Sequence, residues 1–188
     1  REAVFVTIFF AFKGENVDGH AYVEAALNEG AVAAVIDQDV ELSATVLDVR
    51  SAGITDVEDL DLPLLIRVED VMQTLQQAET WWREELGPRV VGITGSVGKT
   101  TTKEMVARIL DQTHNVLRSS GSYNNEIGLP LTLLKLTSDI DYLVQEMGMY
   151  VRGDIFLLPA IAKPDVGVIT NVEPVHAERA GSLEEIAL

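Results

Sequence analysis

The sequence predicts an α/β protein: a small N-terminal α/β domain followed by an incomplete, parallel-sheet central domain of the P-loop type. Apolar strand-like runs alternate with helix-like segments, which indicates parallel strands joined by helical crossovers. One run, in "VVGITGSVGKTTTKE" (90–104), leads through a glycine-containing loop into a helical pattern, as phosphate-binding loops do. At 188 residues and 47% hydrophobic, the chain is long enough to bury a core.

Composition and charge exclude several classes of protein. The net charge is −16, and residues 1–88 carry five basic and 18 acidic side chains, with no cationic cluster that would bind a nucleic acid. No apolar run approaches the roughly 20 residues that cross a bilayer. The absence of cysteine removes disulfides and thiolate sites and fits a reducing compartment. We therefore expect a cytoplasmic protein with no nucleic-acid partner and no membrane insertion. A monomer is expected, although nothing in the composition decides self-association.

The first domain is expected over residues 1–68. Its opening stretch, "FFAFKGENVDGHAYVEAALNEGAVAAVI", predicts a strand, a polar loop, a helix that stops at Gly30 and a second strand. "TVLDVR" and "LPLLIRV" predict two more strands. The expected strands are 8–12, 31–36, 45–50 and 62–68. Residues 69–88 carry apolar side chains at helical spacing and end at a Gly-Pro pair, which predicts a connecting helix.

The second domain, residues 89–188, repeats a strand, loop and helix pattern. Its expected strands are 90–94, 116–119, 142–147 and 166–172. In such sheets, ligands bind beyond the carboxyl ends of the strands. The chain begins without methionine and stops inside an apparent helix, so we expect a fragment of a longer protein.

The candidate phosphate loop follows the strand at 90–94. It comprises Thr94, Gly95, Ser96, Val97, Gly98, Lys99, Thr100 and Thr101. Glycines let backbone N–H groups point inward, and the helix N-terminus adds partial positive charge. Lys99 is expected to contact the outer phosphates, and the Thr100 hydroxyl to bind Mg²⁺. The pattern G-x-x-x-x-G-K-[ST] needs glycine at position 93, where the chain has Ile93, so a plain glycine turn stays open as an alternative.

Two further polar residues follow strands of the same sheet. Glu146 ends the apolar run "DYLVQEMG", where a buried charge requires a cation nearby. His176 lies just past the next predicted strand. Together with Thr100 they offer a hydroxyl, a carboxylate and an imidazole, which suit Mg²⁺ held against a triphosphate. A structural salt bridge for Glu146 and an ordinary loop position for His176 are the alternatives.

The segment "SYNNEIGLPLTLL" places three polar residues before an apolar helix. These are Asn124, Asn125 and Glu126. They either face the nucleotide or a second substrate, or an asparagine caps the helix. Spacing alone does not choose between these roles.

Together the motifs resemble the Mur ligases. "GITGSVGKTTTKE", "NNEIGLPLTLLKL", "EMGMYVRGDI" and "ITNVEPVHAERAGSLEEIA" occur in the order and spacing of that family. The first segment, which contains "GENVDGH", is similar to the N-terminal domain of the branch that joins D-alanyl-D-alanine to UDP-N-acetylmuramoyl-tripeptide. The family's loop, T-G-x-x-G-K-[ST], accounts for the shifted glycines. The resemblance spans nearly the whole chain and implies the Mur ligase fold.

The resemblance implies an ATP- and Mg²⁺-dependent amide ligase of peptidoglycan synthesis that works through an acyl phosphate. It assigns catalysis to Lys99, Glu146 and His176, and Mg²⁺ binding to Thr100, Glu146 and His176. The nucleotide contacts it implies are the phosphate loop together with Asn124, Asn125 and Glu126. The contacts it implies for the uridine end of the sugar substrate are Lys13, Gly14, Asn16, Asp18, Gly19 and His20.

The chain also departs from the family pattern. It has Val6-Thr7 where a Pro-Gly-Asp type turn is usual, and it stops before the family's downstream lysine and C-terminal domain. We therefore expect no turnover from these residues alone. The alternatives are another Mur-type ligase with a different amino acid, a folylpolyglutamate synthase relative, a non-catalytic ATP-binding module, or a P-loop phosphotransferase. "GENVDGH" and "NNEIG" favour the branch named above.

Overall fold

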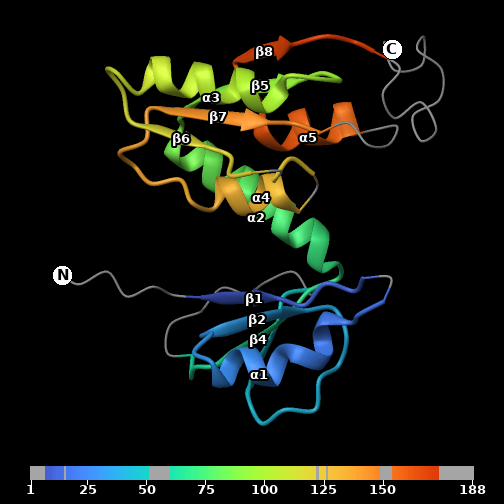
Figure 1. Cartoon of the computed structure of the whole chain (residues 1–188). Helices are drawn as coiled ribbons and strands as arrows, with labels where there is room; N and C mark the ends of the chain where they lie inside the picture. Colours follow the sequence, from blue (N-terminus) through green and yellow to red (C-terminus); the bar gives the residue numbers. More distant parts are fainter. Residues whose placement is uncertain are drawn as a thin grey trace. The chain divides into compact units, whose positions relative to one another are not determined.

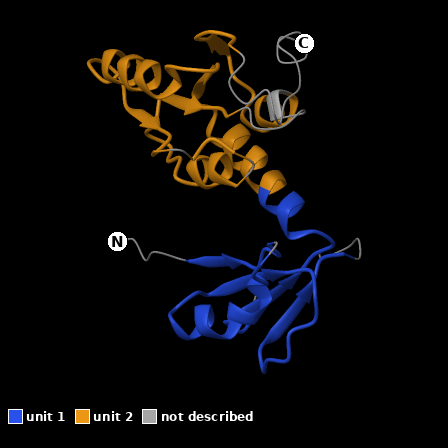
Figure 2. Ribbon diagram, turned by 45° about the vertical axis from the view of Figure 1, so that its right-hand side comes forward, with its two compact units in different colours: residues 1–75 blue, residues 76–188 orange. Residues whose placement is uncertain are grey.

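The structure, a computed structural model, forms two compact units. It describes residues 7–14, 16–50, 60–121, 123–125, 127–148 and 154–173. Unit 1 comprises residues 1–75 and unit 2 residues 76–188 (Figure 2). The division falls inside helix α2 (Val71–Leu86), the helix that the sequence predicts as a connector.

Unit 1 is a four-stranded parallel sheet with a short helix. The strands are β1 (Ile8–Phe10), β2 (Ala33–Ile36), β3 (Thr45–Asp48) and β4 (Leu64–Arg67). They lie in the order β1-β2-β4-β3, and every pair is parallel (Figure 1). A 3₁₀ turn, η1 (Gly19–Tyr22), leads into α1 (Val23–Asn28), which packs against this sheet.

Alternation along the strands gives unit 1 a core on both faces of its sheet. Ala34 and Ile36 of β2 belong to a cluster with Val23 of α1. Val35 between them belongs to a second cluster with Val71 at the start of α2. Successive side chains of a strand point to opposite faces, so one buried strand serves both clusters.

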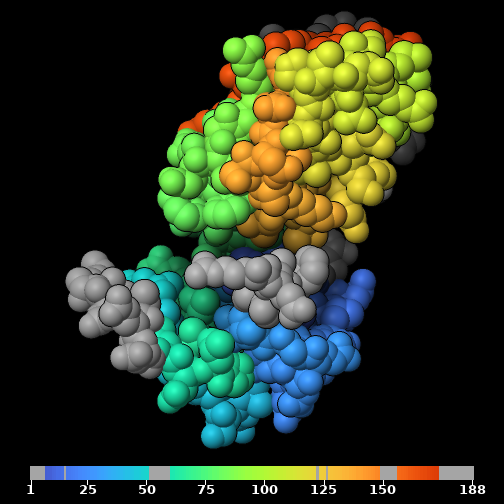
Figure 3. Space-filling view, turned by 90° about the vertical axis from the view of Figure 1, so that its left-hand side faces the viewer, coloured from blue at the N-terminus to red at the C-terminus, as the bar shows by residue number. Residues whose placement is uncertain are grey.

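Unit 2 is a second four-stranded parallel sheet, flanked by helices. Its strands are β5 (Arg89–Thr94), β6 (Val116–Arg118), β7 (Tyr142–Glu146) and β8 (Val166–Ile169), and its helices after α2 are α3 (Lys99–Leu110), α4 (Gly128–Leu133) and α5 (Asp154–Ala162). The strand order is β6-β7-β5-β8. In the space-filling view, the orange part of the chain that leads into β7 lies between green and yellow segments, as this order requires (Figure 3). The predicted α/β architecture with parallel sheets is confirmed.

The helices of unit 2 cover both faces of its sheet (Figure 1). Val90 and Leu143 pack with residues of α4 and α5. Val91 and Val144, their neighbours in sequence, pack with Ala107 of α3 on the other face. Among the described residues, no helix combines the length and the apolar character needed to cross a membrane.

The strand order decides which loops can meet. β5 is an inner strand, with β7 on one side and β8 on the other, so its carboxyl end is flanked by the carboxyl ends of both neighbours. β8 ends at Ile169 instead of the predicted 172, because Thr170 and Asn171 turn to bond the loop after β5. The candidate phosphate loop therefore lies at the centre of the sheet edge.

Candidate nucleotide and metal site

The loop between β5 and α3 depends on two glycines. Gly95 has φ 129° and Gly98 has φ 87°, a region that favours glycine. A Cβ on Gly95 would lie 2.2 Å from the Thr170 hydroxyl, so the chain after β8 approaches this loop closely. Gly98 is the N-cap of α3 and has no side chain to accept from the first-turn N–H groups. The N-terminus of α3 is thus left open to an external anion.

Residues after β8 hold one side of this loop. The Asn171 side-chain oxygen accepts from the Val97 N–H at 2.8 Å, and the Asn171 carbonyl accepts from the Ser96 N–H at 3.0 Å. The Thr170 hydroxyl donates to the Val97 carbonyl at 2.7 Å. Sequence analysis did not single out Thr170 or Asn171. Their position at the carboxyl end of the predicted strand 166–172, where ligands bind in such sheets, is the signal that could have identified them.

Lys99 is the first residue of α3, and its ammonium folds back over the loop. Its Nζ donates to the Gly95 carbonyl at 2.6 Å and to the Ser96 carbonyl at 3.2 Å. The positive charge therefore lies beside the open helix N-terminus, where the sequence places the outer phosphates.

Thr94, at the end of β5, supplies a second sign of a ligand site. Its hydroxyl is buried and has no hydrogen-bond partner among the described residues. A buried hydroxyl without a partner is costly. An incoming polar group, such as a phosphate oxygen, would satisfy it.

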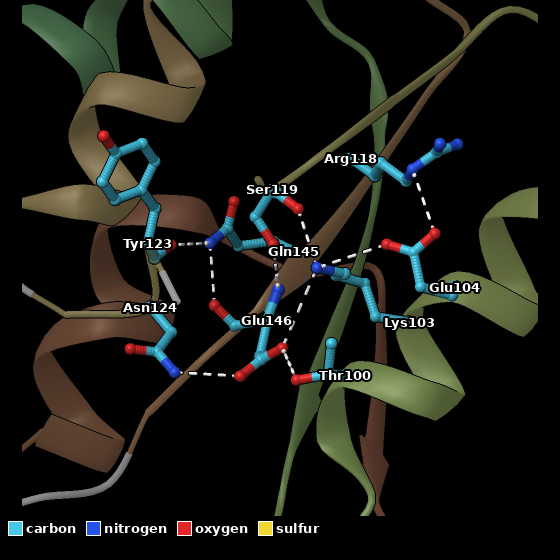
Figure 4. A network of polar contacts seen from close by, with 9 residues as sticks. All are labelled: Thr100, Lys103, Glu104, Arg118, Ser119, Tyr123, Asn124, Gln145 and Glu146. Carbon is cyan, nitrogen blue, oxygen red and sulfur yellow. Dashed lines mark hydrogen bonds and ion pairs between the residues drawn. The ribbon is translucent and has the colours of Figure 1, made fainter. Parts of the chain in front are cut away.

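Glu146 lies at the carboxyl end of β7 and is 3% exposed (Figure 4). Its Oε2 accepts from the Thr100 hydroxyl at 2.8 Å, and its Oε1 accepts from the Asn124 amide at 2.9 Å. Its backbone N–H donates to the Ser119 hydroxyl at 3.0 Å. The structure thus brings together Thr100 and Glu146, which the sequence placed at the ends of neighbouring strands.

The cation that the buried Glu146 requires is Lys103. Its Nζ lies 3.9 Å from Glu146 Oε2, and the side chain is 1% exposed. Sequence analysis asked for a cation but did not identify this one. Lys103 follows Thr100 by three residues on α3, a spacing that places both on one face of the helix.

The two asparagines before α4 have different roles. The Asn125 side-chain oxygen accepts from the Gly128 N–H at 2.8 Å, which is the capping role. Asn124 is buried and donates to Glu146, and its predicted contact with the nucleotide stays a prediction. Glu126 and His176 lie outside the described residues.

The loop after β1 in unit 1 is closed by its own backbone. Lys13 and Asp18 form an isolated antiparallel bridge, and the Gly14 N–H donates to the Val17 carbonyl at 2.9 Å. The Gly19 N–H donates to the Phe12 carbonyl at 2.8 Å. Lys13, Gly14 and Asn16, at the outside of this loop, are exposed.

Asp18 and His20 use their side chains inside unit 1. Asp18 Oδ1 accepts from the His20 backbone N–H at 3.0 Å and lies 2.7 Å from His20 Nδ1. These bonds, the backbone one first, lower the pKa of Asp18. His20 Nε2 lies 3.1 Å from Asp37 Oδ1, and the His20 side chain is 8% exposed. The six residues predicted for the sugar substrate therefore divide into an exposed tip (Lys13, Gly14, Asn16) and an inward-facing base (Asp18, Gly19, His20).

Two family models match this chain and together cover nearly all of it. The Mur ligase middle domain matches residues 93–188, and the Mur ligase family catalytic domain matches residues 6–78. The chain belongs to the Mur ligase family.

Relatives of this Mur ligase chain are similar along nearly all of it. The UDP-N-acetylmuramoyl-tripeptide–D-alanyl-D-alanine ligase of Synechocystis sp. is 42% identical over 187 residues, covering 100% of this chain and 38% of that protein. The ligase of the same name from Bacillus subtilis is 39% identical over 180 residues, covering 96% and 36%. The chain therefore spans little more than a third of the curated relatives it matches.

Solved Mur ligase structures share the fold. The crystal structure of MurF from Acinetobacter baumannii superposes with a TM-score of 0.82 at 29% identity, covering 96% of this chain and 36% of that one. The MurF ligase from Thermotoga maritima in complex with ADP superposes with a TM-score of 0.79 at 33% identity, covering 99% and 39%.

The site of this Mur ligase chain fits Mg²⁺. Thr100 and Glu146 present oxygen donors, which Mg²⁺ prefers, and Mg²⁺ usually takes only one or two protein ligands beside phosphate oxygens and water. No group of three or more His, Cys, Asp or Glu side chains that could hold a metal occurs among the residues the structure describes. Of the predicted metal ligands, the described ones are this pair, and their binding of Mg²⁺ stays a prediction.

One buried carboxyl group of the Mur ligase chain lies outside the site. Glu79 of α2 is fully buried, and neither of its carboxyl oxygens has a hydrogen-bond partner among the described residues. Burial raises its pKa to about 9. Sequence analysis missed it, although its position four residues after the buried Leu75 places it on the same face of α2.

Proposed function

We propose that the chain is the N-terminal part of an ATP-dependent amide ligase that adds D-alanyl-D-alanine to UDP-N-acetylmuramoyl-tripeptide in peptidoglycan synthesis. The relatives that bear this name match over 96% or more of the chain. Residues 1–68 are assigned to the sugar nucleotide, 69–88 to a connecting helix and 89–188 to ATP. We place the complete enzyme in the cytoplasm, as a monomer.

The observation that carries the proposal is the Thr100–Glu146 contact beside the open end of α3. The two side chains come from different strand ends and meet at 2.8 Å. Thr100 is exposed whereas Glu146 is buried, so the pair is reached from one side. Lys99 and the Thr94 hydroxyl lie along the same loop. A nucleoside triphosphate with Mg²⁺ requires such a set of groups: an open helix N-terminus, a cation, and oxygen ligands for the metal.

The proposed reaction has two steps. An oxygen of the tripeptide carboxylate attacks the γ-phosphorus of ATP, the bond to the β–γ bridging oxygen breaks, and ADP leaves. The amine of D-alanyl-D-alanine then attacks the acyl carbon, the C–O bond to phosphate breaks, and the nitrogen loses a proton as inorganic phosphate departs. Bound Mg²⁺ supplies positive charge that offsets the repulsion between the carboxylate and the phosphates.

The chain's own residues have limited tasks in this scheme. Lys99 and the first-turn N–H groups of α3 bind and orient the phosphates. Glu146 and Thr100 would hold the metal, and His176 is proposed as a further ligand. Lys13, Gly14 and Asn16 are the accessible members of the proposed sugar-nucleotide loop.

The test is substrate-dependent ADP release by the complete protein. We expect continuous ADP release only when UDP-N-acetylmuramoyl-tripeptide and D-alanyl-D-alanine are both present, and at most one ADP per protein with the tripeptide substrate alone. Mass spectrometry should detect the pentapeptide product. Ligation of a single amino acid instead would identify another Mur-type ligase. ATP binding without turnover on any UDP-sugar peptide would identify a non-catalytic module.

A further inference from the structure

Lys103 is a lysine in a position where lysine is rarely found. It lies in the second turn of α3 and is 1% exposed, and Ala107, one turn later, is fully buried. Lysine is almost never fully buried unless it is paired. The burial of this ammonium therefore requires partners, and these partners indicate its role.

The Lys103 ammonium joins three elements of unit 2 (Figure 4). It donates to the Ser119 carbonyl, just after β6, at 2.8 Å. It lies 3.5 Å from Glu104 Oε1 on its own helix and 3.9 Å from Glu146 Oε2 at the end of β7. Glu104 in turn pairs with Arg118 at 3.3 Å, so charges of opposite sign alternate from Glu146 outward.

Ser119 closes a ring between Lys103 and Glu146. Its carbonyl accepts from Lys103, and its hydroxyl accepts from the Glu146 backbone N–H. Ser119 is itself buried, and its N–H donates to the Val144 carbonyl at 3.1 Å. The Lys103 ammonium thus fixes the backbone of Ser119, whose hydroxyl bonds Glu146, and it also offsets the negative charge of the Glu146 carboxylate.

Thr100 and Lys103 approach Glu146 Oε2 at different distances. Thr100 bonds Glu146 Oε2 at 2.8 Å, whereas Lys103 stays 3.9 Å away, beyond hydrogen-bond distance. The ammonium therefore offsets the buried negative charge without occupying the oxygen that would bind a metal.

We propose that Lys103 is a positioning residue that serves as the resident counter-ion of Glu146 and keeps this carboxylate in place for Mg²⁺. The inference rests on the proposed magnesium site. It makes one specific claim: the cost of losing Lys103 depends on the charge of Glu146, and a metal ion can take over part of the work of Lys103.

The test is a double-mutant cycle in the complete protein, followed by hydrogen exchange of the α3 and β7 amides with mass spectrometry. Lys103→Met should reduce protection of these amides roughly 100-fold, because breaking a buried pair leaves one charge without a partner. Lys103→Met/Glu146→Gln, which carries neither charge, should regain about tenfold or more. Arg108→Met, an exposed cation on the same helix, is the matched control and should change protection little.

Addition of Mg²⁺ alone gives the second arm. It should raise protection in Lys103→Met by about tenfold or more, and should not do so once Glu146→Gln is also present. Additive costs in the cycle, or rescue by Mg²⁺ that persists without the Glu146 carboxylate, overturn the proposal. If Lys103→Met does not fold, recovery of a folded double variant supports the proposal, and a double variant that is also unfolded overturns it.

This test is independent of ligation. A protein that shows the coupling and the Mg²⁺ rescue but consumes no ATP with its substrates would retain the role of Lys103 and lose the proposed function. A protein that ligates normally but shows additive costs would do the reverse.

Discussion

The two units each place a loop and a helical turn after a parallel strand, but the N-termini of the two helical turns are capped differently. In unit 1 the turn η1 is capped by Asp18, whose carboxylate accepts from the His20 N–H. In unit 2 the helix α3 begins at Gly98, which has no side chain to cap it. A helix N-terminus attracts negative charge. Unit 1 supplies that charge from its own chain, whereas in unit 2 the N-cap Gly98 supplies none, and we propose that phosphate does.

The position of each loop in its sheet explains the rest of the difference. Within the described part of unit 1, β1 is an edge strand that pairs with β2, and Asp37, which directly follows β2, reaches His20. β5 is an inner strand, so Glu146 at the end of β7 and Asn171 just after β8 both reach the segment that follows β5. An inner strand collects side chains from two neighbours, which is what a polyphosphate site needs.

The largest expected effect is the loss of the cation at the open helix. Lys99→Ala should reduce ATP-dependent acyl-phosphate formation by the complete protein about 100-fold or more, because the phosphates lose a preorganised charge. ADP release in the presence of the tripeptide substrate measures it. Arg89→Ala, an exposed cation at the opposite end of β5, is the control. Equal activity of the two variants would show that the open helix does not bind ATP.

Glu146→Gln tests whether the pair beside the open helix binds metal. We expect the Mg²⁺ concentration for half-maximal activity to rise about tenfold or more, because an amide carries no charge to offer the ion. A magnesium titration of ADP release measures the change. An unchanged titration would leave Glu146 as a structural partner of Lys103 and Asn124.

Glu79 contrasts with Glu146. Both are buried carboxyl groups of unit 2, but among the residues the structure describes, Glu146 has hydrogen-bond partners and Glu79 has none. The pKa of Glu79 is about 9 in the folded state, against 4.5 for an ordinary glutamate. At neutral pH the folded state therefore holds a proton that the unfolded state has released. The stability from this group is complete below about pH 4.5 and is lost as the pH rises toward about 9, at no more than about 1.4 kcal/mol per pH unit.

Glu79→Gln removes this titration. The variant should gain stability relative to the wild type between about pH 6 and about pH 8, as seen by hydrogen exchange of the α2 amides. A difference between the two proteins that does not change with pH would show that Glu79 is ionised in the folded state.

The smallest effects are expected at the unit 1 loop, and they separate its tip from its base. Lys13→Ala should weaken binding of the UDP-sugar tripeptide by up to about fivefold without changing stability, because an exposed charge contributes little. Asp18→Ala should lower the unfolding temperature of unit 1 by about 4–8 °C, because the cap of η1 is lost. Titration calorimetry measures the binding of the UDP-sugar tripeptide, and scanning calorimetry measures the unfolding temperature, for both variants. The division fails if Asp18→Ala alters only binding.

The types and spacing of neighbouring residues predicted the strands and part of the candidate site. Apolar runs that alternate with helical patterns predicted each described strand of both sheets, and the predicted strand ends differ from the observed ones by up to three residues. The loop 94–101 was predicted because glycines followed by lysine and threonine, between a strand and a helix, are typical of phosphate-binding loops. The charge of Glu146 at the end of an apolar strand predicted a nearby cation.

Residues that act through partners distant in sequence were not predictable in this way. Asn171 holds the phosphate loop from 74 positions away, and it can do so only because β8 lies beside β5. Asn124 and Asn125 are adjacent and chemically alike, yet one faces Glu146 and the other caps α4. Lys103 and Glu79 look like solvated helix residues until the packing of their helices is known.

The sequence by itself determined the elements, the parallel α/β class and the glycine loop that opens the N-terminus of α3, because these follow from side-chain period and backbone freedom over a few residues. The tertiary structure decided that β7 lies next to β5, and therefore that Thr100 and Glu146, 46 positions apart, meet at 2.8 Å. Strand order depends on the packing of the whole sheet, and no short stretch of sequence carries it.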